Sequence, residues 1–155
     1  MAQRQSNKRE SYFRQVDFIF YREKQIRDAV FEKRNASRDD SISLFPIAEV
    51  SGRISDPTSA KAIKNLTPLK FVVISDGVII KSPERWLEVI DKTYAWSRRQ
   101  TDCRYEVARR RYNNEDYRKT CIDLHISNTT RTRLLETVKI YAALQAVQAG
   151  LIRVG

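Results

Sequence analysis

The spacing of apolar residues constrains the fold of this chain more than any other feature. From Ser11 to Arg34 they recur every three or four positions, with charged residues between them, which predicts an amphipathic helix. The apolar positions of this stretch are Val16, Ile19, Phe20, Ile26 and Val30. The basic residues 1–10 are expected to be frayed, and residues 35–41 (NASRDDS) are typical of a loop.

Residues 56–66 carry a separate signal for the start of a helix. Asp56 can cap the free amides of the first turn, and Pro57 suits the first helical position. Apolar residues then continue at helical spacing as far as Leu66, and Thr67-Pro68 is expected to end this helix.

A β-hairpin is predicted over the residues that follow. Leu69 to Ile74 and Val78 to Ile80 are apolar or β-branched, and Asp76-Gly77 lies between them. An Asp-Gly pair between such runs indicates a tight turn, in which we expect both Asp76 and Gly77 to have positive φ. Because a lone hairpin is marginally stable in water, it should pack against helices.

A long connecting helix is expected over residues 82–112. Its first residues, Ser-Pro-Glu, supply a cap, a first-turn proline and an early acid. An apolar stripe follows at Trp86, Leu87, Ile90 and Tyr94. For Trp86 and Trp96 this spacing favours core packing over base stacking. The charged run at residues 108–112 (ARRRY) is equally typical of a solvated face and of a phosphate contact.

Two short helices with a turn between them are predicted after Asn113. The first has Cys121 and Leu124 on one face, and His125 and Ile126 interrupt it. We expect His125 to be a turn residue. Ser127 can cap a second helix that runs towards Ala149 and stops at Gly150.

This arrangement predicts a helix-turn-helix motif, which needs particular residue types at the contacts. A small residue is needed where the two helices cross, and Cys121 is at that place. Ile126 would be the buried apolar residue of the turn, and Leu134 and Val138 the buried side of the second helix. Arg131 falls at a position that is usually small or apolar, so its stem would lie on the core and its head would reach a phosphate.

The opposite side of the second helix is predicted to contact DNA. Its outward residues are Asn128, Thr129, Thr132, Arg133 and Glu136. Asparagine and arginine can make paired hydrogen bonds with adenine and guanine edges, and threonine can contact a thymine methyl group. The free amides beyond Ser127 favour a phosphate oxygen. Arg118 and Lys119, with residues 109–111, are the further candidates for phosphate contacts.

Charge and composition favour a polyanionic partner. Lysine and arginine number 29 against 19 acidic residues, a net charge of +10, and nucleic acid is the foremost candidate; with the helix-turn-helix, this favours double-stranded DNA. Cys103 and Cys121 lie far apart and form no recognisable metal-ligand pattern, so neither a metal nor another cofactor is expected. No apolar run is long enough to span a bilayer, and we expect a cytoplasmic protein without membrane contact.

An enzyme is not expected. The only histidine, His125, has no serine or cysteine nucleophile near it in a recognisable motif. The carboxylates that a metal-dependent nuclease would need, at Asp39-Asp40, Glu115-Asp116 and Asp123, fall in no motif that we can identify.

The sequence thus predicts a mainly α fold, a multi-helix domain with a small β-hairpin and a C-terminal helix-turn-helix. Its expected parts are an N-terminal helical region with the hairpin (residues 1–81), the connecting helix (82–112) and the C-terminal DNA-binding domain (113–155).

The order of these segments resembles that of late-gene transcriptional regulators of phages and prophages, of the ArpU and RinA type. The resemblance covers most of the chain and is carried mainly by the stretches DPT (Asp56 to Thr58) and CIDLHIS (Cys121 to Ser127). The C-terminal segment is also similar to region four of bacterial sigma factors. This resemblance implies an activator of packaging and morphogenesis genes in a bacterial host cell, with host RNA polymerase as a partner.

Other functions stay open at this stage. A phage packaging component, such as a small terminase subunit, also binds phage DNA through a helix-turn-helix. Such subunits form rings and usually carry the motif at the N-terminal end, whereas here it is C-terminal. Whether this chain forms a homo-oligomer is left undecided by the sequence.

Overall fold

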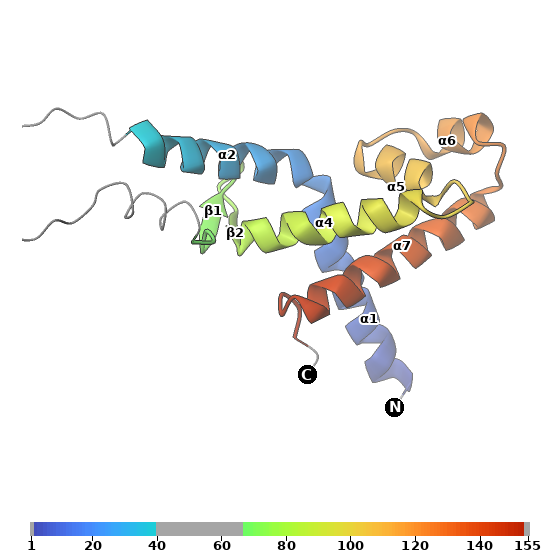
Figure 1. The fold of residues 1–155 in the computed structure, drawn as a ribbon. Helices are drawn as coiled ribbons and strands as arrows, with labels where there is room; N and C mark the ends of the chain where they lie inside the picture. The colour runs from blue at the N-terminus through green and yellow to red at the C-terminus, as the bar shows by residue number, and fades with distance from the viewer. Residues whose placement is uncertain (1, 40–66, 154–155) are drawn as a thin grey trace, which may run out of the picture. The chain divides into compact units, whose positions relative to one another are not determined.

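The structure of the chain, a computed structural model, describes residues 2–39 and 67–153, with side chains from 10–36 and 67–153. Its elements are α1 (Ala2–Tyr21), α2 (Glu23–Asp39), β1 (Phe71–Val73), β2 (Ile79–Lys81), α4 (Pro83–Arg98), α5 (Arg104–Tyr112), α6 (Tyr117–Asp123) and α7 (Asn128–Gln148) (Figure 1). The predicted mainly helical fold with a small antiparallel hairpin is confirmed. The helix expected over residues 56–66 lies outside the described residues.

The N-terminal helical region differs from the prediction in three ways. One helix was expected from Ser11 to Arg34, but the structure has two, with a break at Arg22 where the N–H donates to the Ile19 carbonyl at 3.1 Å. The helix also begins at Ala2, so residues 2–10 are helical rather than frayed. The predicted loop at residues 35–41 is helical as far as Asp39, because this polar stretch contains neither glycine nor proline to end a helix.

The chain divides into two compact units. The first unit joins Met1–Lys24 to Arg85–Gly155, and the second unit is Gln25–Glu84. The connecting helix expected over residues 82–112 is two helices, α4 and α5, separated by residues 99–103. Within this connection, the Asp102 carboxylate accepts the N–H of Arg104, the first residue of α5, at 3.1 Å.

The second unit contains the hairpin. Val72 pairs with Ile80, and both side chains are buried. Only Gly77 of the predicted pair has positive φ (75°), so the expected two-residue turn is wrong. Instead, the Gly77 N–H donates to the Ile74 carbonyl at 2.8 Å and the Ile74 N–H to the Val78 carbonyl at 3.0 Å. This is a longer turn with a left-handed glycine after it, which a single Asp-Gly signal does not distinguish.

Polar contacts join this hairpin to the helices beside it within the second unit. Lys33 of α2 donates to the Phe71 carbonyl at 2.7 Å, and its ammonium lies 4.2 Å from the Phe71 ring centroid. Glu84 accepts the Leu69 N–H at 2.8 Å and pairs with Arg34 at 2.6 Å. Glu84, the early acid of α4, therefore binds both the segment before β1 and α2, a role that the cap signal did not predict.

The core of the first unit is built from α1, α4, α5 and α7. Its fully buried apolar side chains include Val16, Phe20, Ile90, Val107, Ala108, Val138, Ala142 and Ala146. Trp86 is buried as predicted, with 7% of its surface exposed, whereas Trp96 is only half-buried. The first unit thus provides a fixed support for the surface of α7.

Candidate nucleic-acid interface

The last three helices, α5, α6 and α7, each contact the other two. Asp116 starts α6, because its carboxylate accepts the N–H groups of Arg118 at 2.6 Å and Lys119 at 3.3 Å. Four residues, 124–127, then connect α6 to α7 (Figure 1). The bend that the sequence predicted between the two helices is therefore present.

The turn after α6 has a defined hydrogen-bond pattern. The Ile126 N–H donates to the Cys121 carbonyl at 3.0 Å, and the His125 N–H donates to the Ile122 carbonyl at 3.2 Å. This is a Schellman motif, whose residue beyond the cap must take a left-handed conformation. His125 has φ 51° and is exposed, so its predicted place in the turn is confirmed.

Ser127 caps α7 as predicted. Its backbone is extended (φ −73°, ψ 158°), and its Oγ accepts the Thr130 N–H at 3.1 Å. Because that bond satisfies one of the free amides at the start of the helix, the position where α7 begins is fixed.

The buried sides of α6 and α7 differ from the prediction by one residue each. Val138 is fully buried as expected, but Leu135 takes the place expected for Leu134, which is only half-buried. On α6 the buried residue is Thr120, while Cys121 is half-buried. Thr120 can be buried because its hydroxyl donates to the Asp116 carbonyl at 3.1 Å, leaving no unpaired donor. Ile126, expected to be buried in the turn, is half-buried.

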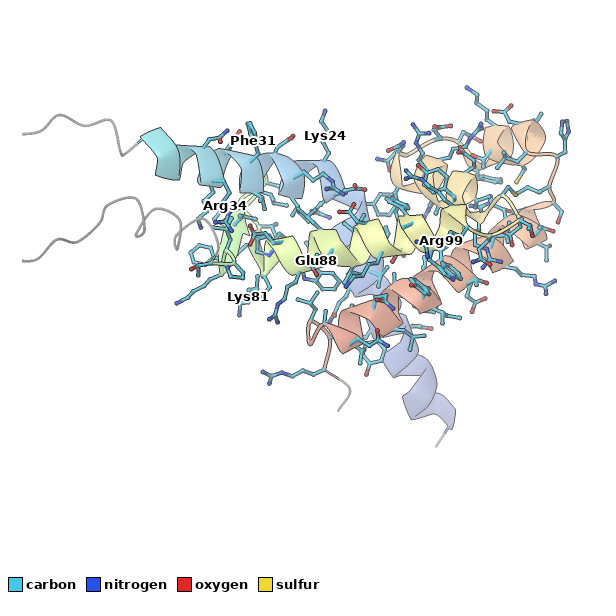
Figure 2. The ribbon with its side chains drawn as sticks, viewed as in Figure 1. Lys24, Phe31, Arg34, Lys81, Glu88 and Arg99 are labelled. Atoms are coloured by element: carbon cyan, nitrogen blue, oxygen red, sulfur yellow. The ribbon has the colours of Figure 1, made fainter. Side chains whose placement is uncertain are left out.

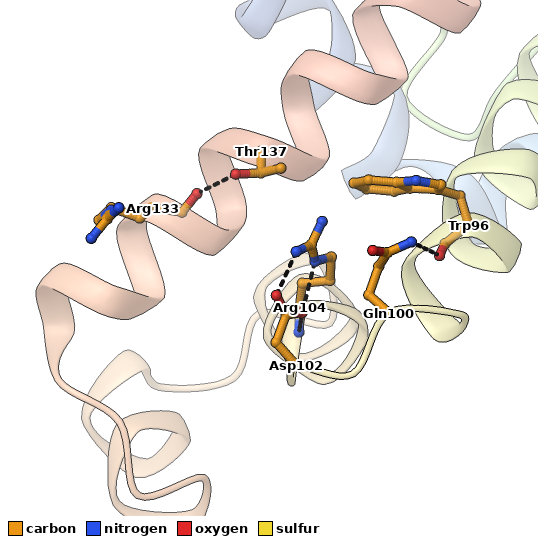
Figure 3. A network of polar contacts seen from close by, with 6 residues as sticks. All are labelled: Trp96, Gln100, Asp102, Arg104, Arg133 and Thr137. Atoms are coloured by element: carbon orange, nitrogen blue, oxygen red, sulfur yellow. Dashed lines mark hydrogen bonds and ion pairs between the residues drawn. The ribbon is translucent and has the colours of Figure 1, made fainter.

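The predicted outward residues of α7 are all exposed. They are Asn128, Thr129, Thr132, Arg133 and Glu136. The hydroxyls of Thr132 and Thr137 each donate to the carbonyl four residues earlier at 2.9 Å (the Thr137 bond is drawn in Figure 3). Within the described part of the chain, the Arg133 guanidinium has no hydrogen bond or ion pair, so its donors are available to a ligand.

Arg131 joins the start of α7 to the start of α6. It is half-buried, its Nε donates to Asn128 Oδ1 at 3.1 Å, and its guanidinium lies 5.3 Å from the Tyr117 ring centroid. Part of the Arg131 side chain is therefore covered, as expected for a stem that lies on the core. The Asn128 oxygen keeps a second lone pair for another donor.

Tyr117 is a candidate that the sequence argument missed. The residue is 44% exposed, and Arg118 both donates to its hydroxyl at 3.2 Å and places its guanidinium 5.8 Å from the ring centroid. Two cations therefore meet at one tyrosine, one from each helix. The sequence did contain a signal for this site, because an aromatic residue stands directly before the basic pair Arg118-Lys119.

Lys119 has different surroundings from Arg118. It lines a hollow of about 210 Å³ between α5 and α6 together with Glu106, Arg109, Arg110, Glu115 and Asp123. Arg110 pairs there with Asp123 at 2.6 Å, and this hydrogen bond is the main cause that raises the pKa of Arg110. Arg110, the middle residue of the arginine run 109–111, is thus paired with a carboxylate of the same chain. Lys119 has three carboxylates near it, those of Glu106, Glu115 and Asp123.

Two further kinds of feature were sought among the described residues. They contain no group of three or more histidine, cysteine or acidic residues that could hold a metal ion. None of their helices combines the length and the apolar character that crossing a bilayer requires. Comparisons with protein-family models, curated proteins and solved structures gave no match.

Proposed function

We propose that this chain binds double-stranded DNA sequence-specifically, with the first turns of α7 in the major groove. One observation carries the proposal. Ser127 caps α7, and the first turns of the helix expose Asn128, Thr129, Thr132 and Arg133, of which Thr129 and Arg133 face away from the buried Leu135. A polar face at the start of a helix whose other side is held in a core is the arrangement that groove reading requires.

The dimensions and chemistry of the groove favour this partner. The major groove is about 12 Å wide, close to the diameter of a helix with its side chains. Arg133 can bind guanine O6 and N7 through two donors, and Asn128 can pair with the N6 and N7 edge of adenine. The methyl groups of Thr129 and Thr132 suit thymine, and Glu136 can accept from cytosine N4.

The surroundings of α7 supply phosphate contacts for the proposed complex. Arg118 and Arg131 meet at Tyr117, and the exposed tyrosine hydroxyl and guanidinium groups are donors that bind phosphate oxygens. The net charge of +10 adds long-range attraction to a polyanion.

The biological role that we propose is regulation of transcription. It rests on the resemblance to phage and prophage late-gene regulators, which implies activation of packaging and morphogenesis genes and contact with host RNA polymerase in the bacterial cytoplasm. A packaging function predicts a ring of many copies, so light scattering on the full chain separates the two roles.

Replacing Arg133 tests base reading directly. Arg133→Ala should weaken binding to a duplex selected from a random pool by about 1–3 kcal/mol, because two hydrogen bonds to guanine are lost. Binding to a scrambled duplex of equal length should change much less. Gel-shift titrations on both duplexes measure the difference.

Arg153→Ala is the matched control, since Arg153 is exposed and lies beyond the C-terminal end of α7, which is itself roughly 22 Å along the helix from Arg133. Equal losses on the selected and scrambled duplexes for Arg133→Ala would contradict base reading. If the unaltered chain selects no sequence from the pool, the proposed function itself is wrong.

A further inference from the structure

The last turn of α4, directly before the connection to α5 (residues 99–103), is attached to the middle of α7 through an aromatic stack. The Trp96 ring lies 4.2 Å from the Tyr141 ring, and the two planes differ by only 3°. The Arg104 guanidinium lies over the same indole, 4.9 Å from its centroid. Because Tyr141 occupies one face of Trp96, Arg104 covers the other.

Hydrogen bonds hold the two ends of this connection. Asp102 accepts from the Arg104 side chain through both carboxylate oxygens, one of them at 2.7 Å from Nε, and only 16% of the Arg104 side chain is exposed. At the other end, the Gln100 side chain donates to the Trp96 carbonyl at 3.4 Å (Figure 3). Arg104 is thus a structural partner and is not free to bind a ligand.

The attachment point lies where α7 would leave the groove in the proposed complex. A helix rises about 1.5 Å per residue, so roughly eight residues fit across a groove that is about 12 Å wide. Residues 128–136 take up that length. Tyr141 follows in the next turns, close to where the helix would pass the phosphate backbone.

Arg99 is the cation that this connection presents. It is exposed, and its N–H donates to the Trp96 carbonyl at 3.1 Å, which fixes its backbone at the end of α4 (labelled in Figure 2). Its neighbour Arg98 donates to the Tyr105 hydroxyl at 2.6 Å, whereas the Arg99 guanidinium has no partner among the residues described.

We propose that Arg99 is a further phosphate-binding residue, which contacts the DNA backbone beside the groove that α7 occupies. Trp96, Tyr141, Arg104 and Asp102 are positioning residues that hold the connection against α7. This inference rests on the proposed function, and it adds an element that lies before the helix-turn-helix in the sequence.

Salt dependence tests the inference, because each phosphate contact adds about 0.9 to the slope of log affinity against log salt. Arg99→Ala should reduce that slope by about 1 and weaken binding about fivefold at moderate salt, on the selected and scrambled duplexes alike. Lys92→Ala is the control, because Lys92 is an exposed cation on α4 and pairs with Glu88 at 3.9 Å. It should leave the slope unchanged.

A second pair of variants tests the positioning role. Tyr141→Ala removes the stack and should lower the salt slope as Arg99→Ala does, with no further loss in the double variant, while Tyr141→Phe keeps the wild-type slope. An Arg99→Ala protein with the wild-type slope overturns this inference. If Arg133→Ala still loses sequence preference in that case, the proposed function stands. If the unaltered chain binds no duplex, the proposed function fails instead.

Discussion

At the scale of single residues, Ser97 is a buried side chain without a polar partner. It is 1% exposed, and among the described residues its Oγ has no hydrogen bond. Thr93, one turn earlier and 0% exposed, donates to the Val89 carbonyl at 2.7 Å. An unpaired buried hydroxyl costs about 1–3 kcal/mol of folding stability, so the Ser97 hydroxyl destabilises the fold whereas the bonded Thr93 hydroxyl does not.

Replacing Ser97 should therefore stabilise the protein. Ser97→Ala should raise the free energy of unfolding by about 1 kcal/mol, because it removes the unpaired hydroxyl and little volume. Urea unfolding followed by circular dichroism measures the change. Thr93→Ala is the control and should lower stability, since it removes a bonded hydroxyl and leaves a cavity. A loss of stability in Ser97→Ala would show that the hydroxyl is paired in solution.

The residue scale also shows the limit of sequence reasoning about the site. The Ser127 cap, the His125 turn and the exposure of Asn128 and Arg133 were predicted correctly, because each depends on neighbours within a few positions. The contact between Tyr117 and Arg131 was not predicted, since it depends on how α6 packs against α7.

At the scale of elements, α5, α6 and α7 end in the same way. Each has a left-handed residue beyond its cap, at Asn114 (φ 60°), His125 (φ 51°) and Gly150 (φ 68°). In each case the next residue's N–H returns to the last turn, as for Glu115 to Arg110 at 3.0 Å and Leu151 to Ala146 at 2.9 Å. Gly150 was recognised from the sequence as a stop, because glycine is the usual residue at this position, and His125 was recognised as a turn residue.

His125 is the least favourable of these three residues. A left-handed conformation costs roughly 1–2 kcal/mol for a residue with a Cβ, and asparagine tolerates it better than histidine. His125→Gly should raise the free energy of unfolding by about 1 kcal/mol, since glycine has no such strain. Thermal unfolding measures the change, which should appear as a higher Tm.

Gly150→Ala is the matched opposite change. An added Cβ at Gly150 would meet no atom within 4 Å, so any loss of stability reports backbone strain alone. Gly150→Ala is expected to lower stability. If His125→Gly lowers it as well, the prediction is wrong, and the His125 imidazole makes a stabilising contact that outweighs the backbone strain.

At the scale of the whole molecule, Asp17 joins three helices of the first unit. It accepts from the Tyr112 hydroxyl of α5 at 2.9 Å and from Lys139 of α7 at 2.6 Å. Tyr112 is 6% exposed, and burial, with the nearby Asp17 charge as a lesser cause, raises its pKa well above the ordinary 10.0. The N-terminal helix is therefore held to the C-terminal one by a part-buried polar junction.

This junction should make stability fall in alkaline solution. The folded state holds the Tyr112 proton above the unfolded pKa of about 10, so unfolding releases a proton there and stability decreases as pH rises. Tyr112→Phe should lower stability at pH 8 by about 1 kcal/mol through the lost hydrogen bond, and should show a shallower decrease above pH 10. Urea unfolding at both pH values tests this. An equal decrease in both proteins would contradict a raised Tyr112 pKa.

By itself, the sequence determined the mainly helical character, the hairpin, the Ser127 cap and the polar face of α7. These depend on residue types and spacing within a turn or two, where local hydrogen bonds and hydrophobic periodicity decide the outcome. Only the tertiary structure decided that Leu135 and Thr120 are the buried residues. It also decided that Arg110 pairs with Asp123 and that Trp96 stacks on Tyr141. A helix turns by 100° per residue, so a core partner distant in the sequence selects which of two adjacent side chains is buried.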